Sequence, residues 1–149
     1  MKKLILPLLL VFFLLLGAAE SRAAFTMEDE MKLGRESYEK IKGRGLLIED
    51  GEINEYLRRI GDLITEQGQE TPFRFTYSVI DSRGINAFAT PGGYVYLYRG
   101  LIELTENESQ LAGVMAHEIA HVRARHIAQA IEKSQKISLA TLAAIVAGA

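Results

Sequence analysis

The sequence predicts an α+β fold, and three patterns support this prediction. Apolar residues recur at intervals of three and four between residues 53 and 64, which is the period of an amphipathic helix. Residues 73–79 alternate between apolar and polar side chains, which is the period of a strand with one buried face. Residues 114–134 contain neither glycine nor proline and predict a long helix. We therefore expect a small mixed or antiparallel sheet that packs against helices.

Length and composition indicate a single domain with a sizeable core, because the chain has 149 residues of which 48% are hydrophobic. The net charge is −2 and no basic cluster carries interleaved aromatic residues, so we expect no nucleic-acid partner. There are no cysteines, which excludes a disulfide framework, a thiolate zinc site and a cysteine nucleophile. Any zinc would have to be held by histidine and carboxylate.

Residues 1–23 have the three-part plan of a secretory signal peptide. A basic start is followed by an apolar run over residues 4–16, and the segments 17–19 and 21–23 each offer small residues at the −3 and −1 positions of a cleavage site. An uncleaved anchor is the alternative, but a spanning helix needs ~20 apolar residues and this run is shorter. We therefore expect cleavage near residue 19 or 23 and an exported domain comprising residues 24–149.

Two helices are expected at the start of this domain. Thr26 can cap the first, with Asp29 three residues later, and the glycine-containing segment 43–45 ends it. The apolar stripe predicted on this helix consists of Met27, Met31, Leu33, Tyr38 and Ile41. Asp50 is expected to cap the second helix, which ends between residues 68 and 72.

Three short strands are expected next, at residues 73–79, 85–89 and 94–98, with turns at 81–84 and 91–93. Tyr94, Tyr96 and Tyr98 share one face of the third strand. They could form a binding surface, but cross-strand packing is the interpretation that we prefer.

The last helix carries the pattern around which the prediction of function is built. Thr105 and Glu108 have the spacing of a capping box, so we expect this helix to begin at about Glu106. The tail, residues 137–149, is mainly small and apolar. We interpret it as a buried helix cut off by the boundary of the sequence. A membrane-associated segment, too short to span, is the alternative.

Residues 117–121 read His-Glu-Ile-Ala-His on this helix. Residues four apart in a helix lie ~40° from one another around the axis, so His117 and His121 project from one face and can bind one tetrahedral ion. Glu118 lies ~100° from His117, where its carboxylate can reach a water on that ion. The alternative is a buried helix that carries two histidines by chance, but its apolar surroundings give such residues no obvious partners. The spacing predicts a zinc site.

Several stretches, in this order, resemble the HtpX/CAAX-endopeptidase group of zinc peptidases, and within it the periplasmic BepA-like branch and the mitochondrial Oma-type enzymes. They are Asn-Ala-Phe-Ala at 86–89, Pro-Gly-Gly at 91–93, Gly-Leu at 100–101, His-Glu-Ile-Ala-His-Val at 117–122 and Arg-His at 125–126. The resemblance covers roughly residues 28–149. It implies a zincin fold of the gluzincin type, in which a small sheet with an edge strand lies beside the active-site helix.

This resemblance implies a zinc metalloendopeptidase, a hydrolase that binds one Zn²⁺ per chain and cleaves polypeptides of the bacterial periplasm or envelope. His117 and His121 would hold the metal, and Glu118 would take a proton from the attacking water. Asn86 and Ala87 match the edge strand that binds extended substrate through its backbone. A hairpin with both edges covered is the structural alternative.

The third zinc ligand is not evident in the sequence. His126 lies ~140° from His121 around an unbroken helix, so we expect His126 and Arg125 to bind carboxylates or carbonyls. Ala124 stands where metzincins have glycine, Ile127 stands where they have a third histidine, and Glu132 is ~16 Å from His121 along the axis.

In the resembling family the third ligand is a glutamate on a later helix, so we expect this chain to be the N-terminal portion of a longer peptidase with an unknown downstream domain. The alternative function is a truncated, non-catalytic zincin that binds extended polypeptide like a chaperone.

Overall fold

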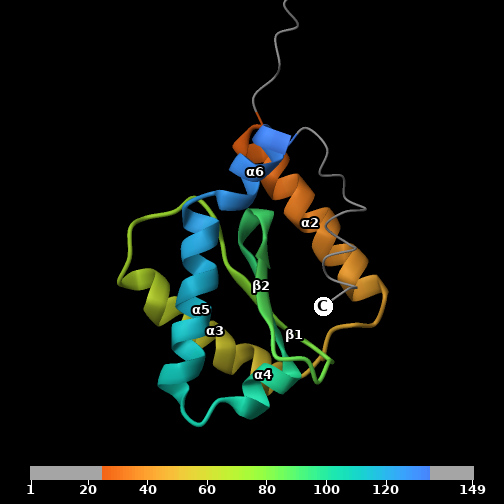
Figure 1. Ribbon diagram of the computed structural model, residues 1–149, viewed down its shortest axis with the longest axis vertical. Coiled ribbons are helices and arrows are strands. Elements are labelled where there is room, and N and C mark those ends of the chain that lie inside the picture. Colours follow the sequence, from red (N-terminus) through yellow and green to blue (C-terminus); the bar gives the residue numbers. More distant parts are fainter. Residues whose placement is uncertain (1–24, 135–149) are drawn as a thin grey trace, which may run out of the picture.

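The computed structural model describes residues 25–134 (Figure 1). The predicted signal peptide and the apolar tail lie outside the described residues. Within the described range, no helix combines the length and the apolar character needed to cross a membrane.

The described chain folds into helices around a small sheet. The elements are α2 (Met27–Gly43), α3 (Gly51–Glu66), β1 (Thr76–Ile80), β2 (Ala87–Thr90), the short turn η1 (Pro91–Gly93), β3 (Tyr94–Tyr98), α4 (Arg99–Leu104), α5 (Glu108–Arg123) and α6 (His126–Ser134). The strand order is β1-β3-β2, with β1 parallel and β2 antiparallel to β3. The sheet is therefore mixed, and the predicted α+β class is confirmed.

One face of the sheet packs against α3 and α5. Val79, Val95 and Leu97 are each 0% exposed on this face, and they form one core with Leu57 of α3 and Met115 of α5. α5 lies against β2, α3 and, less extensively, β3, and its buried residues run from Leu111 to Val122, so the histidine-bearing helix is anchored along its length.

The opposite face packs against α2, so the sheet lies between α5 and α2 (Figure 1). The ring of Tyr96 stacks on Phe88 with a centroid distance of 4.8 Å. The ring of Tyr94 stacks on Tyr38 of α2 with a centroid distance of 5.1 Å. The tyrosine row is therefore used for packing, as we expected.

Strand boundaries and burial differ in part from the sequence expectations. The first strand begins at Thr76 instead of residue 73, and the second covers 87–90 instead of 85–89. We predicted that the first strand buries only one face. This prediction is wrong for the end of β1, because Ser78 and Ile80 are buried together with Tyr77 and Val79. Helices on both sides of the sheet account for this.

The first two helix caps are as predicted, but the buried face of α2 is not. Thr26 and Asp29 form a capping box, and the Asp50 side chain accepts hydrogen bonds from the amides of the next helix. Met31, which we placed in the apolar stripe, is 40% exposed. The buried residues of this helix are Glu30, Gly34, Ser37 and Ile41. Small and polar residues therefore form much of the packed face.

The close approach of α2 to the turn between β2 and β3 explains the small residues. Gly92 and Gly93 have φ angles of 79° and 96°, in the left-handed region that favours glycine. A Cβ atom added to Gly34 would lie 1.9 Å from the carbonyl oxygen of Pro91. Any side chain at residue 34 would therefore push α2 away from the turn.

The start of α5 also differs from the prediction. The helix begins at Glu108, where Asn107 is the N-cap and its side chain accepts from the amide of Gln110 at 3.1 Å. Thr105, the expected cap, instead donates to the carbonyl of Ile102. Thr105 is instead the C-cap of the separate helix α4, so the expected capping box does not form.

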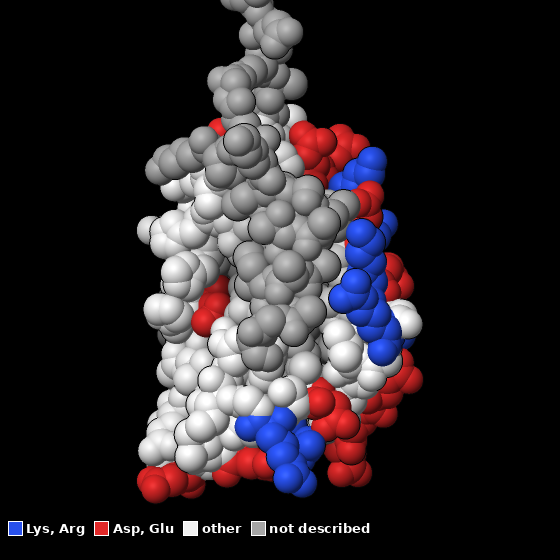
Figure 2. Space-filling view, turned by 45° about the vertical axis from the view of Figure 1, so that its right-hand side comes forward, with Lys and Arg blue, Asp and Glu red and all other residues white. Residues whose placement is uncertain are grey.

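Surface charges of both signs lie close together. Lys and Arg side chains lie beside Asp and Glu side chains along the right-hand side and at the lower end of the view in Figure 2. On α2, acidic residues occupy the first turn and lysines the last turn, which complements the helix dipole.

Candidate metal centre

The two imidazoles of the His-Glu-x-x-His stretch converge on the surface of α5. The Nε2 atoms of His117 and His121 are 3.0 Å apart, and the ring planes cross at 77°. Two nitrogens bound tetrahedrally to one zinc ion at ~2.0–2.1 Å would be ~3.3 Å apart. The observed separation is close to this value, so the spacing of the two nitrogens is compatible with one shared cation.

Glu118 is the residue between these histidines that faces a different side of the helix. Its side chain is partly buried, whereas His117 is exposed and His121 is partly buried. Within the described part of the chain, no hydrogen bond or ion pair engages the Glu118 carboxylate. A carboxylate in this state is able to accept a proton from a water near the imidazoles.

We expected one helix over residues 114–134, but the structure interrupts it just after the motif. α5 ends at Arg123, Arg125 has a φ of 52°, and α6 begins at His126. This break turns the chain and brings His126 beside His121, with their Nδ1 atoms 2.8 Å apart. The prediction that His126 binds a carboxylate or carbonyl is therefore wrong, because it assumed an unbroken helix.

The same prediction is correct for Arg125. Its Nε atom donates to the Glu30 carboxylate at 2.7 Å, and its side chain also reaches the carbonyl of Phe25. The side chain of Glu30 is only 2% exposed. The pair joins α2 to the junction between α5 and α6, which lie next to each other in Figure 1.

Glu30 was missed in the sequence because reading α2 by hydrophobicity selected other residues. The spacing of the buried residues could have revealed it. They recur at helical intervals, but only the last of them is a large apolar residue: Glu30, Gly34, Ser37 and Ile41. A glutamate on a face of small residues is a candidate for a buried ion pair.

A third metal ligand is not found among the described residues. No cluster of three or more His, Cys, Asp or Glu side chains in the range 25–134 could hold a metal ion. His126 lies near the motif, but it contacts the Nδ1 side of His121, whereas the Nε2 side faces His117. The structure therefore shows two convergent nitrogens and places His126 behind one of them.

The predicted substrate strand forms one edge of the sheet. β2 pairs with β3 on one side only, and no described strand pairs with its other side. The amide of Tyr98 donates to the carbonyl of Asn86 at 3.0 Å. Because bonded and non-bonded pairs alternate in an antiparallel ladder, the amide and carbonyl of Ala87 point away from β3. Ala87 thus offers backbone groups to the open edge, and the backbone carbonyl of Asn86 does not.

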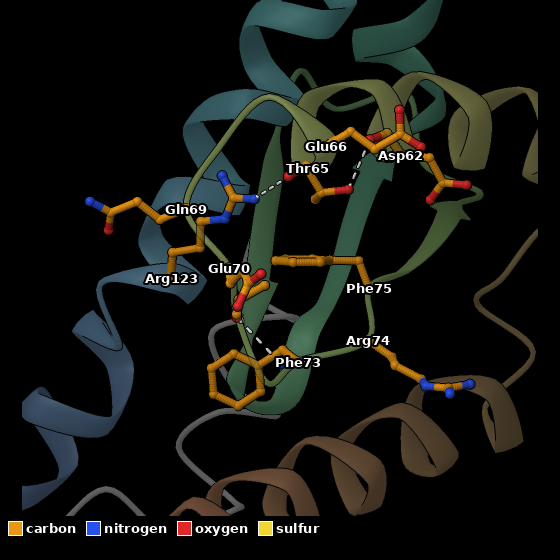
Figure 3. Close-up of a pocket in the computed structure, with 10 residues that line it drawn as sticks. Asp62, Thr65, Glu66, Gln69, Glu70, Phe73, Arg74, Phe75 and Arg123 are labelled. Atoms are coloured by element: carbon orange, nitrogen blue, oxygen red, sulfur yellow. Dashed lines mark hydrogen bonds between the residues drawn. The ribbon is translucent and has the colours of Figure 1, made fainter.

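A hollow of about 490 Å³ lies on a different side of α5 (Figure 3). It is lined by the end of α3, the segment 69–75 and Arg123, which donates to the carbonyl of Thr65 at 2.7 Å. Two residues along a helix correspond to ~200° around the axis, so Arg123 faces away from His121. The hollow is therefore separate from the imidazole pair.

Comparison with known proteins identifies the family. Residues 50–149 match the model of Peptidase family M48. A Vibrio cholerae protein named "Putative beta-barrel assembly-enhancing protease" is 38% identical over 83% of this chain and 25% of its own length. The Escherichia coli (strain K12) beta-barrel assembly-enhancing protease is 36% identical over 76% of this chain and 23% of its own.

A eukaryotic relative also matches. The mitochondrial metalloendopeptidase OMA1 of Schizosaccharomyces pombe is 28% identical over 76% of this chain and 34% of its own length. The matched part of the chain thus spans between 23% and 34% of the length of these relatives. The chain belongs to the M48 family of peptidases.

Proposed function

We propose that the chain carries the metal-binding and substrate-binding part of a zinc-dependent endopeptidase. The observation that supports this most directly is the 3.0 Å separation of the His117 and His121 Nε2 atoms on α5. Membership of the M48 family agrees with it. The arrangement of a small mixed sheet beside the histidine-bearing helix agrees with a gluzincin-type zincin fold.

The residues present fit zinc as two of its three protein ligands. Neutral imidazole is a good zinc ligand, and a chain without cysteine can use only histidine and carboxylate. The third ligand is proposed to be a glutamate on a later helix of a longer polypeptide, because the relatives extend well beyond the matched part. Zinc bound there would make a water acidic enough to attack an amide near neutral pH.

Glu118 is the proposed general base. Its carboxylate would accept a proton from the attacking water and deliver it to the nitrogen of the leaving amine. The absence of any described partner for this carboxylate leaves it available for both transfers. Its position between the two histidines in the sequence supports this role, because the carboxylate could reach a water on the metal without ligating the metal.

Asn86 and Ala87 are the proposed substrate-binding residues. An extended peptide can add to the open edge of β2 as a further strand, using the amide and carbonyl of Ala87. Since the Asn86 carbonyl is engaged by Tyr98, a contact from Asn86 would come from its partly buried side chain. The peptide would then run beside α5, where the imidazoles lie.

The substrate class and compartment are proposed from the relatives and from the predicted signal peptide. The printed names of the bacterial relatives describe proteases that enhance assembly of beta-barrels. We propose that the chain is exported and acts on misfolded or misassembled polypeptides of a bacterial periplasm or envelope. Mass spectrometry of the mature N-terminus tests the proposed signal peptide, and an intact Met1 would reject its cleavage.

A non-catalytic polypeptide-binding protein is the second candidate, because no third ligand is found among the described residues. Casein hydrolysis with and without a chelator, for this chain and for a C-terminally extended form, separates the two. Chelator-sensitive cleavage by the extended form supports the peptidase. Binding of casein by both forms without cleavage, unchanged by the chelator, supports the second candidate.

A further inference from the structure

The break between α5 and α6 is an unusual backbone feature beside the candidate metal centre. Arg125 is the one described residue other than glycine with a positive φ, and left-handed backbone is unfavourable for side chains that carry a Cβ. Such a residue persists when its surroundings hold it in place, and strained positions gather at functional sites. In this conformation Arg125 contacts Glu30, and the residue that follows it contacts His121.

The break is held from two sides. Arg125 donates to the buried Glu30 carboxylate of α2, so the junction cannot straighten without leaving that carboxylate unpaired. The Gln129 side chain donates to the carbonyl of Ala124, the C-cap residue of α5, at 2.8 Å. These contacts fix the place at which α6 begins.

The first residue of α6 is thereby placed against a candidate metal ligand. The His126 Nδ1 atom lies 2.8 Å from the His121 Nδ1 atom, and the two ring centroids are 4.9 Å apart. In a continuous helix the two side chains would be ~140° apart around the axis and would not meet. The turn at Arg125 therefore creates this contact.

The chemistry of imidazole indicates which of the two Nδ1 atoms donates the hydrogen bond and which accepts it. If His121 binds a metal through Nε2, that nitrogen offers its lone pair, so the hydrogen of the neutral ring is on Nδ1. The group within hydrogen-bond distance of that Nδ1 is the Nδ1 of His126, which must then accept. Ligating histidines generally donate their other N–H to such a partner, which fixes the ring orientation.

We infer that His126 is a positioning residue, which accepts a hydrogen bond from His121 Nδ1–H and thereby aims His121 Nε2 at the metal, and that the Glu30–Arg125 pair holds it there. This inference rests on the proposed function, since it concerns the same metal site. It assigns His126 a role as the partner of a ligand and removes it as a candidate for the third ligand.

The test uses two variants of nearly equal size. In His126→Asn the amide oxygen can replace the accepting nitrogen, whereas His126→Leu offers no acceptor. Zinc affinity of the chain, measured by competition with a chromophoric chelator, should fall about 10- to 100-fold in His126→Leu. It should remain within about threefold of wild type in His126→Asn. Glu132→Gln, at an exposed position on α6 away from this junction, should bind zinc like wild type.

A second measurement, made without metal, determines which ring nitrogens of His121 and His126 carry a hydrogen. Long-range ¹H–¹⁵N NMR of the metal-free chain at about pH 8.5, where free histidine is neutral, should show the His121 hydrogen on Nδ1 and the His126 hydrogen on Nε2. The Nδ1 signal of His121 should shift more in His126→Leu than in His126→Asn.

The inference is overturned if His121 carries its hydrogen on Nε2, or if His126→Leu binds zinc as tightly as wild type does. Failure of the wild-type chain to bind zinc at all, with the His121 hydrogen on Nδ1, would instead count against the proposed metal site. The two failures are therefore distinguishable.

Discussion

The Arg125 guanidinium donates a 2.7 Å hydrogen bond to the Glu30 carboxylate, which joins two residues 95 positions apart in the sequence. The partners differ in environment, because the Glu30 side chain is 2% exposed and that of Arg125 is 34% exposed. The contact links the N-terminal helix to the end of the histidine-bearing helix. Four predictions follow from this arrangement and from the candidate site.

Removing Arg125 should cost more stability than removing Glu30. Arg125→Ala leaves a buried carboxylate without its cation and should lower the free energy of unfolding by about 3 kcal/mol. Glu30→Ala leaves a guanidinium that can reach solvent, so its effect should be smaller. Urea denaturation measures both, and Arg58→Ala, which removes an exposed ion-paired arginine on α3, is a control with little expected effect. Equal losses for the two members of the pair would contradict this account.

Zinc should stabilise the fold through the histidine pair. At a free zinc concentration about 100 times the dissociation constant, a ligand bound only by the folded state adds about 2.7 kcal/mol. The thermal midpoint of the wild-type chain should therefore rise with zinc. It should not rise in His117→Ala or His121→Ala. Magnesium, which prefers oxygen ligands, is the control and should leave the midpoint unchanged. A zinc-induced rise that survives loss of both histidines would place the metal elsewhere.

Glu118→Gln should retain zinc and lose peptide hydrolysis. The amide cannot accept the proton of the attacking water, and general base catalysis contributes about 10²- to 10⁴-fold in rate. Hydrolysis is measured on the extended form of the chain, together with its zinc content. Glu132→Gln, at an exposed position on α6, should keep full activity. If Glu118→Gln cleaved at the wild-type rate, another group would be the base.

A proline at residue 87 should weaken peptide binding without unfolding the protein. Ala87→Pro removes an amide that points to the open edge of β2 and leaves the ladder to β3 intact. Loss of one hydrogen bond of about 1 kcal/mol should lower kcat/KM about fivefold in the extended form. Phe88→Pro is the contrasting variant, because its amide pairs with β3 and its loss should disrupt the circular dichroism spectrum. Unchanged kcat/KM in a folded Ala87→Pro protein would argue against strand addition at this edge.

Local patterns were sufficient for much of the fold. The caps at Thr26 and Asp50, the strand at residues 94–98 and the packing role of its tyrosines follow from short-range rules, and the structure agrees with them. The convergence of His117 and His121 is of the same kind, because the geometry of one helix dictates it. Burial on both faces of β1 was not predicted, since it depends on which helices cover the sheet.

The sequence by itself determined the class of fold, the M48-like succession of motifs and the pairing of two imidazoles on adjacent helical turns. Only the tertiary structure decided where the histidine-bearing helix ends and what His126 touches. The reason is that no glycine or proline lies near Arg125 to indicate the helix break in the sequence. At the break Arg125 pairs with a carboxylate on a helix that is distant in sequence, and such a contact becomes visible only when the chain is folded.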